Sequence, residues 1–450
     1  MKQQNKTIKP VIKTENHSFT LKKKDTTLEQ IEHTHPAELA RSFNKKGIHS
    51  LEHKAQLTHQ SITIQNQKNI YPYERFLEKG SNVSAHVKTP NTTNHEECII
   101  WTTNLYLGLN RHKKVLESIK KTSELYGSGS GTSAVCGGFS DSHKTLELNL
   151  SKFFNKEDTI LYPTGFSANQ GALSTLADKG DLILFDKDCH ASIISGILLS
   201  GATFKSFHHC NPTDLEKKLI HARTKHYNNI FVVSESVFSL SGAEAPILEY
   251  CTLKKKIPFY LYIDEAHSFG VYGKHGRGYC DELGCLDQID FLMSTLSKSA
   301  ASIGGFISTK KEYCSLLRVS SNPFLFQATI PPINAASAVT ALDIFESEPE
   351  LKDHLWENTK KLRNGIQELG FDTGNSKSPI IPIYIKDDQK LADLCKLLFE
   401  KGVFTNWIAY PGVKKGQGRL RFVVSAAHSF EQIDKTVECL VEVGKKLQVI

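Results

Sequence analysis

The stretch Phe259-Tyr260-Leu261-Tyr262-Ile263-Asp264-Glu265-Ala266-His267 joins five apolar residues directly to a polar cluster. Short runs that are apolar on both faces are typical of strands buried inside a parallel sheet. Three similar runs precede it, at 158–162, 181–185 and 230–233, and polar residues lie at or just past the carboxyl end of each. Because the runs alternate with helical patterns, the sequence predicts an α/β fold with a mostly parallel sheet.

The chain divides into four segments by composition and pattern. We expect residues 1–68 to form a polar, basic extension, largely disordered, with a short helix near Leu28–Phe43. Residues 69–123 form an N-terminal segment, 124–335 a large cofactor-binding domain, and 336–450 a small C-terminal α+β domain. That last domain is predicted from a strand at 380–385, a helix at 391–401, a strand at 420–424 and a helix at 429–447.

Charge in this chain is concentrated at its start. The formal net charge is +7, and residues 1–68 carry twelve Lys and Arg against six Asp and Glu. We interpret this segment as a solvated tail, with a basic arm for anionic lipid or a partner as the alternative. Nucleic-acid binding is not expected, because the tail lacks interleaved aromatic residues and a recognisable module.

No apolar run approaches 18 residues and no signal-peptide pattern opens the chain, so we expect a cytoplasmic protein. Its ten cysteines are scattered and form no C-x-x-C pair. The histidines of the first 68 residues follow no ligand spacing either. No disulfide framework and no metal site are therefore predicted.

Lys298 lies in Ser294-Thr295-Leu296-Ser297-Lys298-Ser299-Ala300, about thirty residues after Asp264. Taken alone, Lys298 reads as a solvated charge and Asp264 as a helix cap or ion-pair partner. Together they match the usual way of holding pyridoxal phosphate (PLP). The lysine supplies a Schiff base, and the aspartate keeps the pyridine nitrogen protonated so that the ring accepts electrons.

Other polar groups fit the same cofactor. Backbone N–H groups of Gly165 and Phe166, at a helix start, form an anion site, although an ordinary strand-to-helix turn looks the same. The hydroxyls of Thr295 and Ser297 are candidate phosphate donors. His267, three residues after Asp264, is a candidate donor to the phenolic oxygen of the cofactor.

Two further residues are candidates with open alternatives. His143 follows the Gly-rich segment 126–132, and its imidazole could stack on a conjugated ring or simply face solvent on a helix. Arg421 lies within the apolar strand 420–424, where a charge needs a partner. A substrate carboxylate held bidentately is one such partner, and a surface position is the alternative.

The motifs, in their order along the chain, resemble the α-oxoamine synthases, PLP enzymes of fold type I. The resemblance covers roughly residues 70–450. It is carried by 104–109, 138–143, His190-Ala191-Ser192, Glu235-Ser236-Val237-Phe238-Ser239, Asp264-Glu265-Ala266-His267-Ser268, Gly276-Arg277-Gly278, Thr295-Leu296-Ser297-Lys298, 329–332 and 425–428.

This resemblance implies an aminotransferase-like fold and a homodimer with shared active sites. It implies that Lys298 is the Schiff-base lysine and general base, and that Asp264 is the partner of the pyridine nitrogen. The other roles it implies are the phenolic-oxygen contact for His267, ring stacking for His143, phosphate binding for Gly165, Phe166, Thr295 and Ser297, a cofactor contact for Ser239, a phosphate contact in the neighbouring subunit for Thr329, and amino-acid carboxylate binding for Asn104 and Arg421.

The implied reaction is the decarboxylative condensation of an amino acid with an acyl-CoA to an α-amino ketone. Around Lys298 and at 348–351 the chain is most similar to bacterial serine palmitoyltransferases of sphingolipid biosynthesis, which implies L-serine and palmitoyl-CoA as substrates. Peripheral membrane contact is left open. Around Ser133-Ala134 it also resembles 8-amino-7-oxononanoate synthases. A non-catalytic partner subunit is a third hypothesis, disfavoured because Lys298, Asp264 and His143 are all present.

Overall fold

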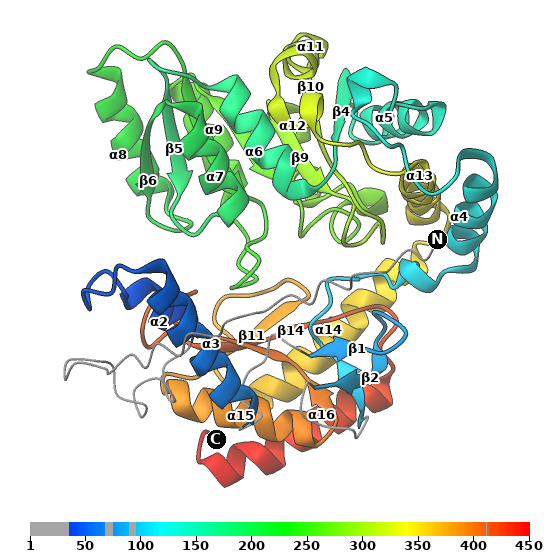
Figure 1. Cartoon of the computed structure of the whole chain (residues 1–450). Coiled ribbons are helices and arrows are strands. Elements are labelled where there is room, and N and C mark those ends of the chain that lie inside the picture. The colour runs from blue at the N-terminus through cyan, green and yellow to red at the C-terminus, as the bar shows by residue number, and fades with distance from the viewer. Residues whose placement is uncertain (1–35, 68–74, 90–95, 411) are drawn as a thin grey trace, which may run out of the picture. The chain divides into compact units, whose positions relative to one another are not determined.

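The computed structural model describes residues 36–67, 75–89, 96–410 and 412–450, and it divides into two compact units. One unit ends at Tyr71, and the other runs from Pro72 to Ile450. Figure 1 labels the helices and strands of both.

The first unit contains two helices, α2 (Pro36–Ser42) and α3 (Leu51–Gln67). Leu39, Phe43, Ile48 and Leu57 form a small core of their own. The expectation of disorder is therefore wrong for residues 36–67, although α2 falls inside the predicted short helix. Helix α3 escaped prediction because few apolar residues mark its buried side. Residues 1–35, including the start of the predicted helix, lie outside the described part of the chain.

A seven-stranded sheet forms the centre of the second unit, with strand order β4-β10-β9-β8-β7-β5-β6 (Figure 1). Four neighbouring pairs, from β9 through to β6, are parallel, whereas β10 is antiparallel to both β9 and β4. The strands are β4 (Asp158–Tyr162), β5 (Leu182–Asp186), β6 (Thr203–Phe207), β7 (Ile230–Glu235), β8 (Tyr260–Asp264), β9 (Phe291–Thr295) and β10 (Gly305–Thr309).

The predicted runs correspond to β4, β5, β7 and β8, and the mostly parallel sheet is confirmed. Strands β6, β9 and β10 were not predicted. Strand β6 is an exposed edge, so little apolar sequence marks it. Strand β10 is fully buried, although it contains the polar residues Ser308 and Thr309. The Ser308 hydroxyl can be buried because it forms a hydrogen bond with the Thr159 hydroxyl at 2.7 Å.

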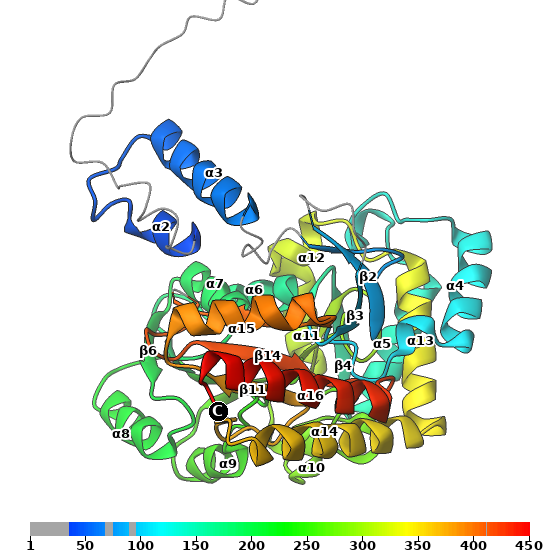
Figure 2. The same ribbon diagram turned by 90° about the horizontal axis from the view of Figure 1, so that it is seen from below.

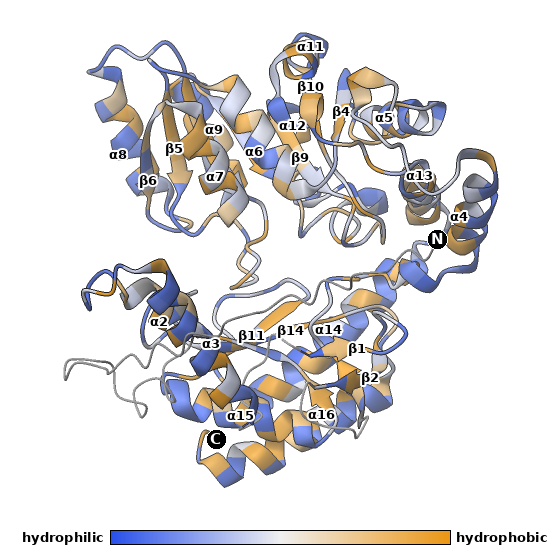
Figure 3. Ribbon diagram, viewed as in Figure 1, coloured by the Kyte–Doolittle hydropathy of each residue, from blue (hydrophilic) through white to orange (hydrophobic). Residues whose placement is uncertain are grey.

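Helices cover the faces of this sheet. Figure 3 shows hydrophobic residues along β5 and mixed hydropathy on the covering helices, as expected for elements with one buried side. They are α5 (Asp141–Phe153), α6 (Gly165–Leu176), α7 (Ala191–Ser200), α8 (Pro212–Arg223), α9 (Ile247–Lys256), α10 (Tyr279–Glu282), α11 (Lys311–Ser320) and α12 (Asn322–Phe326). Two further helices, α4 (Lys113–Tyr126) and α13 (Pro332–Ser347), contact each other, and α13 also contacts α5.

The C-terminal part contains a three-stranded sheet of order β11-β14-β13. Figure 2 shows α14, α15 and α16 beside β11 and β14. The elements are β11 (Ile380–Tyr384), β13 (Asn406–Ile408), β14 (Arg419–Val423), α14 (Glu350–Glu368), α15 (Asp388–Glu400) and α16 (Phe430–Leu447). The predicted strands and helices of this region are all present, with small shifts at their ends.

A second small sheet joins distant parts of the chain. Strands β1 (Phe76–Leu77), β2 (Ser84–Lys88) and β3 (Glu96–Ile100) are completed by β12 (Val403–Phe404), which runs parallel to β3. Buried Trp101, just after β3, stacks on His428 at 4.0 Å between ring centres. The N-terminal segment of the second unit is therefore built onto the C-terminal part.

Among the described residues, no helix is both long enough and apolar enough to cross a membrane.

One partly buried ion cluster joins strand β4 to two of the helices that cover the sheet, α5 and α11. Arg318 of α11 contacts Asp158 at 2.5 Å and Glu147 at 2.9 Å, and Glu147 is 1% exposed. Burial raises the pKa of the Glu147 carboxyl to about 7, against the opposing effect of Arg318. The arginine therefore compensates a carboxylate that has little access to water.

We expect Arg318→Met to lower the free energy of unfolding by about 2 kcal/mol, because buried Glu147 then keeps only Lys144, 3.9 Å away, as a cation. The midpoint of urea unfolding measures this change. The matched control is Arg223→Met, an exposed arginine at the end of α8, with an expected change below about 0.5 kcal/mol. Equal midpoints for the two variants would contradict this account of the cluster.

Candidate active site

The carboxyl ends of the parallel strands meet at one cavity of about 290 Å³. Its walls come from 164–169, 190–192, 264–267 and 293–298, with Glu235 at the end of β7. Ligands of open α/β sheets bind at this edge. A larger hollow of about 400 Å³ near α12 is lined by no titratable side chain, so we assign the chemistry to the strand-end cavity.

Asp264 ends β8 and is 4% exposed. One carboxylate oxygen accepts from Asn169 Nδ2 at 2.7 Å, and the other accepts from the Ala266 backbone N–H at 2.8 Å. Within the described residues, no Lys, Arg or His nitrogen lies within 4 Å of it. A buried carboxylate with only neutral donors has room for one cation, as the protonated ring nitrogen of PLP requires.

Lys298 follows β9 and lines the same cavity. Burial lowers the pKa of its amine to about 8, against smaller opposing effects of the Asp264 and Glu235 carboxylates. A substantial neutral fraction near neutral pH makes this amine a much better nucleophile than an ordinary lysine.

An anion cradle lies at the start of α6. Thr164 caps the helix by accepting from the Ser167 backbone N–H at 3.0 Å, and the first N–H groups of the helix have no acceptor within it. A Cβ on Gly165 would lie 2.8 Å from Thr295 Oγ1, so only glycine fits there. The Thr295 and Ser297 hydroxyls lie 2.9 Å apart beside it. This donor set fits a phosphate.

His267 is 6% exposed, and its Nδ1 lies 2.7 Å from the Tyr106 hydroxyl. Burial lowers its pKa far below the ordinary value, and Lys298 and Arg421 add to the shift. Burial also raises the pKa of Tyr106. A neutral imidazole facing a protonated hydroxyl is therefore the expected state of this pair.

The structure places His143 away from the cavity, contrary to its predicted role as ring stacker. Its Nε2 lies 2.7 Å from the Ile330 carbonyl oxygen, and its Nδ1 accepts from the Ser140 backbone N–H as part of a helix cap. Both ring nitrogens thus have structural partners. Two other imidazoles line the cavity: His267, described above, and His190, which lies in the polar cluster that follows β5. The position of His190 in a polar cluster at the end of a predicted strand was the feature of the sequence that pointed to the cavity.

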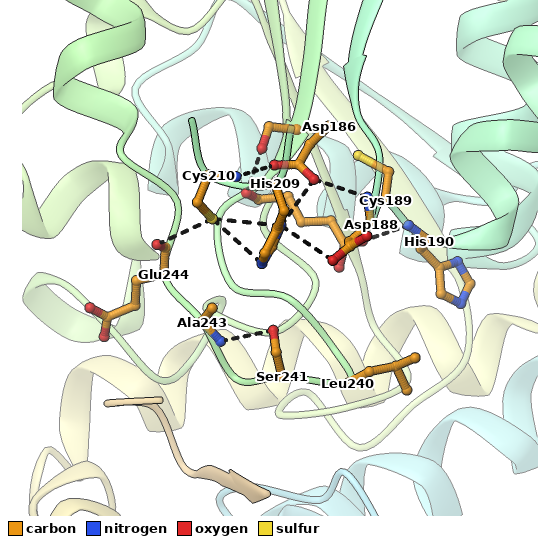
Figure 4. Close-up of polar contacts among 12 residues, drawn as sticks. Asp186, Asp188, Cys189, His190, His209, Cys210, Leu240, Ser241, Ala243 and Glu244 are labelled. Atoms are coloured by element: carbon orange, nitrogen blue, oxygen red, sulfur yellow. Dashed lines mark hydrogen bonds and ion pairs between the residues drawn. The ribbon is translucent and has the colours of Figure 1, made fainter. Parts of the chain in front are cut away.

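Two buried carboxylates, Glu235 and Asp186, hold the loop that carries His190, and Figure 4 shows the contacts of Asp186. Glu235 accepts from the His190 backbone N–H at 2.6 Å. Asp186 accepts from the backbone N–H groups of Asp188 and Cys210 and lies 3.0 Å from His209 Nδ1. Hydrogen bonds to the last residues of β5 and β7 therefore hold this loop in place.

Asp186, His209 and Cys210 lie close enough to hold a metal ion. However, Cys210 Sγ is 3.7 Å from both ring nitrogens of His209, so it does not lie along either lone pair. Burial raises the pKa of this thiol to about 12, which disfavours the thiolate that a metal needs. We assign the cluster to loop support.

Asn104 and Arg421 are brought together. Arg421 Nη2 donates to Asn104 Oδ1 at 2.8 Å, and its buried Nε has no hydrogen-bond partner. Burial lowers the pKa of this guanidinium, and its charge in turn disfavours protonation of Lys298. An unpaired guanidinium near Lys298 fits the predicted role in binding a substrate carboxylate.

Ser239 and Thr329 are not among the residues that line the cavity. Ser239 is partly buried just after β7, and the Thr329 backbone N–H donates to the Thr132 carbonyl at 3.1 Å. The predicted phosphate contact of Thr329 involves a second subunit, so it stays a prediction.

Comparison with known proteins gives a consistent result. The family model for class I and II aminotransferases matches residues 96–440. An 8-amino-7-oxononanoate synthase from Treponema denticola is 37% identical over 79% of this chain and 90% of its own length. A serine palmitoyltransferase from Bacteroides ovatus is 36% identical over 85% of this chain and 95% of its own length. A solved serine palmitoyltransferase holding PLP has a TM-score of 0.84 and 29% identity, covering 89% of this chain and 100% of its own.

We expect the apoprotein to fix PLP on Lys298 at a rate that rises with pH and levels off above about 8, because only the neutral amine reacts. Below that pH the rate should fall about tenfold per unit. Borohydride reduction and the mass of the Lys298 peptide measure the rate, and Lys298→Ala is the blank. Labelling of a different lysine would contradict the assignment.

Gly165→Ala should weaken PLP binding by about tenfold or more, because the added methyl group collides with Thr295. Equilibrium titration of the apoprotein with PLP measures the affinity. Gly129→Ala is the matched control, since a Cβ there meets nothing within 4 Å and the backbone is ordinary. Equal affinities of the two variants for PLP would show that its phosphate does not bind at Gly165.

Proposed function

Because this chain belongs to the class I and II aminotransferase family, as a PLP-dependent α-oxoamine synthase, we propose that it condenses L-serine with palmitoyl-CoA to 3-oxosphinganine. The balanced reaction releases one CoA and one carbon dioxide for each α-amino ketone formed. The observation that carries the proposal is the shared cavity of Asp264, Lys298 and the anion cradle.

PLP, when bound, supplies an electron sink that stabilises negative charge on the amino-acid Cα. The cradle residues Gly165, Phe166, Thr295 and Ser297 hold its phosphate, and Asp264 holds its ring nitrogen. In this proposal His190 takes the ring-facing role first given to His143, and His267 contacts the phenolic oxygen.

Lys298 performs the proton transfer in this scheme. Its amine would accept the Cα proton at Nζ, and its lowered pKa suits such a base. Arg421 and Asn104 would hold the amino-acid carboxylate and so orient the amino acid in the cavity. The guanidinium also keeps a second positive charge near Nζ and so favours the neutral amine.

The choice of serine and palmitoyl-CoA is supported by the similarity around Lys298 and by the fit to serine palmitoyltransferase structures. A second candidate is an 8-amino-7-oxononanoate synthase, favoured by the identity to the Treponema denticola protein. Contacts to one hydroxyl or methylene separate such substrates. We also propose a homodimer in which Thr329 reaches the partner's phosphate.

The experiment that tests the proposal is a panel of L-serine, L-alanine and glycine against palmitoyl-CoA and pimeloyl-CoA, with the PLP-loaded protein. CoA release gives the rate, and mass spectrometry identifies the ketone. Serine with palmitoyl-CoA should give the highest rate. Turnover of alanine with pimeloyl-CoA alone would replace this function by the second candidate, and CoA release without a ketone would reject both.

A further inference from the structure

Strand β14 carries two arginines on one face, since residues two apart in a strand point the same way. Arg421 is the one that contacts Asn104. The other, Arg419, is 6% exposed. Leu420 and Phe422, which alternate with them, are both fully buried in the core. Adjacent side chains on one strand face are separated by about 7 Å along the strand.

Arg419 has only neutral hydrogen-bond partners. Its Nε donates to the Gln417 carbonyl at 3.1 Å, and its Nη1 donates to the Tyr384 hydroxyl at 2.9 Å and to the Leu240 carbonyl at 3.5 Å. Its guanidinium also lies over the Tyr384 ring, 4.4 Å from the centroid. Within the described part of the chain, no carboxylate oxygen lies within 4 Å.

Burying the Arg419 charge without a carboxylate partner costs free energy that a purely structural residue would not need to lose. Burial lowers the pKa of Arg419, which means that the surroundings disfavour its charge. A neutral donor such as glutamine would make the same carbonyl contacts without that penalty. A buried cation that lacks an anion, as with Arg421, points to an anion that arrives with the substrate.

The neighbours of Arg419 connect it with the cavity. Leu240, whose carbonyl it contacts, directly follows Ser239 on the loop after β7. Asp188, whose charge partly offsets the effect of burial on Arg419, precedes His190 on the loop after β5. Both Asp188 and Leu240 appear with His190 in Figure 4. Arg419 thus lies beside the two loops that end at the cofactor site.

We propose that Arg419 binds an anionic group of the acyl donor. Arg421 takes the carboxylate of the amino acid, so the second cation on the same strand face is available to the other substrate. The anion is either a terminal carboxylate on the acyl chain or a phosphate of CoA. The inference rests on the proposed use of an acyl-CoA.

The identity of the anion separates the two candidate reactions. A palmitoyl chain carries no charge, so a palmitoyl-CoA enzyme uses Arg419 for a CoA phosphate. A pimeloyl chain ends in a carboxylate, which pairs bidentately with a guanidinium.

The test compares Arg419→Gln with the unaltered PLP-loaded protein by calorimetric titration with CoA and with pimeloyl-CoA. Loss of one charge-assisted contact should raise Kd by about 10- to 100-fold. A rise for both ligands assigns the phosphate, and a rise for pimeloyl-CoA alone assigns the carboxylate. Arg419→Lys should recover part of the loss. Because binding is measured without turnover, the result is independent of whether the proposed condensation occurs.

Three controls separate binding from support of the fold. Tyr384→Phe removes the hydroxyl contact but keeps the charge, so it should leave both Kd values unchanged. Arg363→Gln removes a partly buried arginine that donates to the Ser378 carbonyl, and it should also bind normally. Arg421→Gln should raise KM for the amino acid, whereas Arg419→Gln should not.

Unchanged Kd values in Arg419→Gln would overturn the proposal. Equal losses in Arg419→Gln and Tyr384→Phe would overturn it as well, because they would assign Arg419 to the support of β11 and the loop after β7.

Discussion

The buried negative charge of Asp264 is the constraint on which the site depends. Its hydrogen bonds come from neutral groups, so the charge is oriented without being cancelled. Glu235 lies opposite Asp264 in the β7–β8 register, and burial together with the Asp264 charge raises its pKa well above the ordinary value. Neighbouring carboxylates in a dry site do not both ionise readily. Burial thus disfavours the charge of Glu235, and it also lowers the pKa of the Lys298 amine in the same cavity to about 8.

The sequence allowed the chemistry at the strand ends to be predicted better than the direction of individual side chains. Asp264 was recognisable because it directly follows an apolar run typical of a buried strand. Lys298 was recognisable because small and hydroxyl residues surround it. His143 and His190 both follow recognisable motifs, but which imidazole enters the cavity depends on helix packing. His143 is turned toward Ile330, nearly two hundred positions later in the chain. Strand β10 was also missed, because its hydroxyl groups are satisfied by partners distant in the chain, Ser308 by Thr159 of β4 and Thr309 by the Asp290 carbonyl.

The large sheet and the C-terminal part contribute different chemistry. The sheet ends at the cavity lined by Asp264, Lys298 and the start of α6, where Gly165 allows close approach to Thr295. Strand β14 supplies fixed positive charge from the other side, through Arg421 and its neighbour two positions earlier. In the proposed function, the sheet residues bind the cofactor, and the arginines of β14, which have no carboxylate partner among the described residues, bind the substrates. The reaction therefore needs both parts.

The pairing of β12 with β3 has a consequence for synthesis on the ribosome. The strands of the large sheet leave the ribosome as one continuous stretch and can associate while translation continues. Strands β1 to β3 emerge earlier but wait for Val403 and Phe404. Asn104 likewise waits for Arg421, 317 positions later. A chain interrupted before that point would carry every strand of the large sheet but would lack β12 and Arg421.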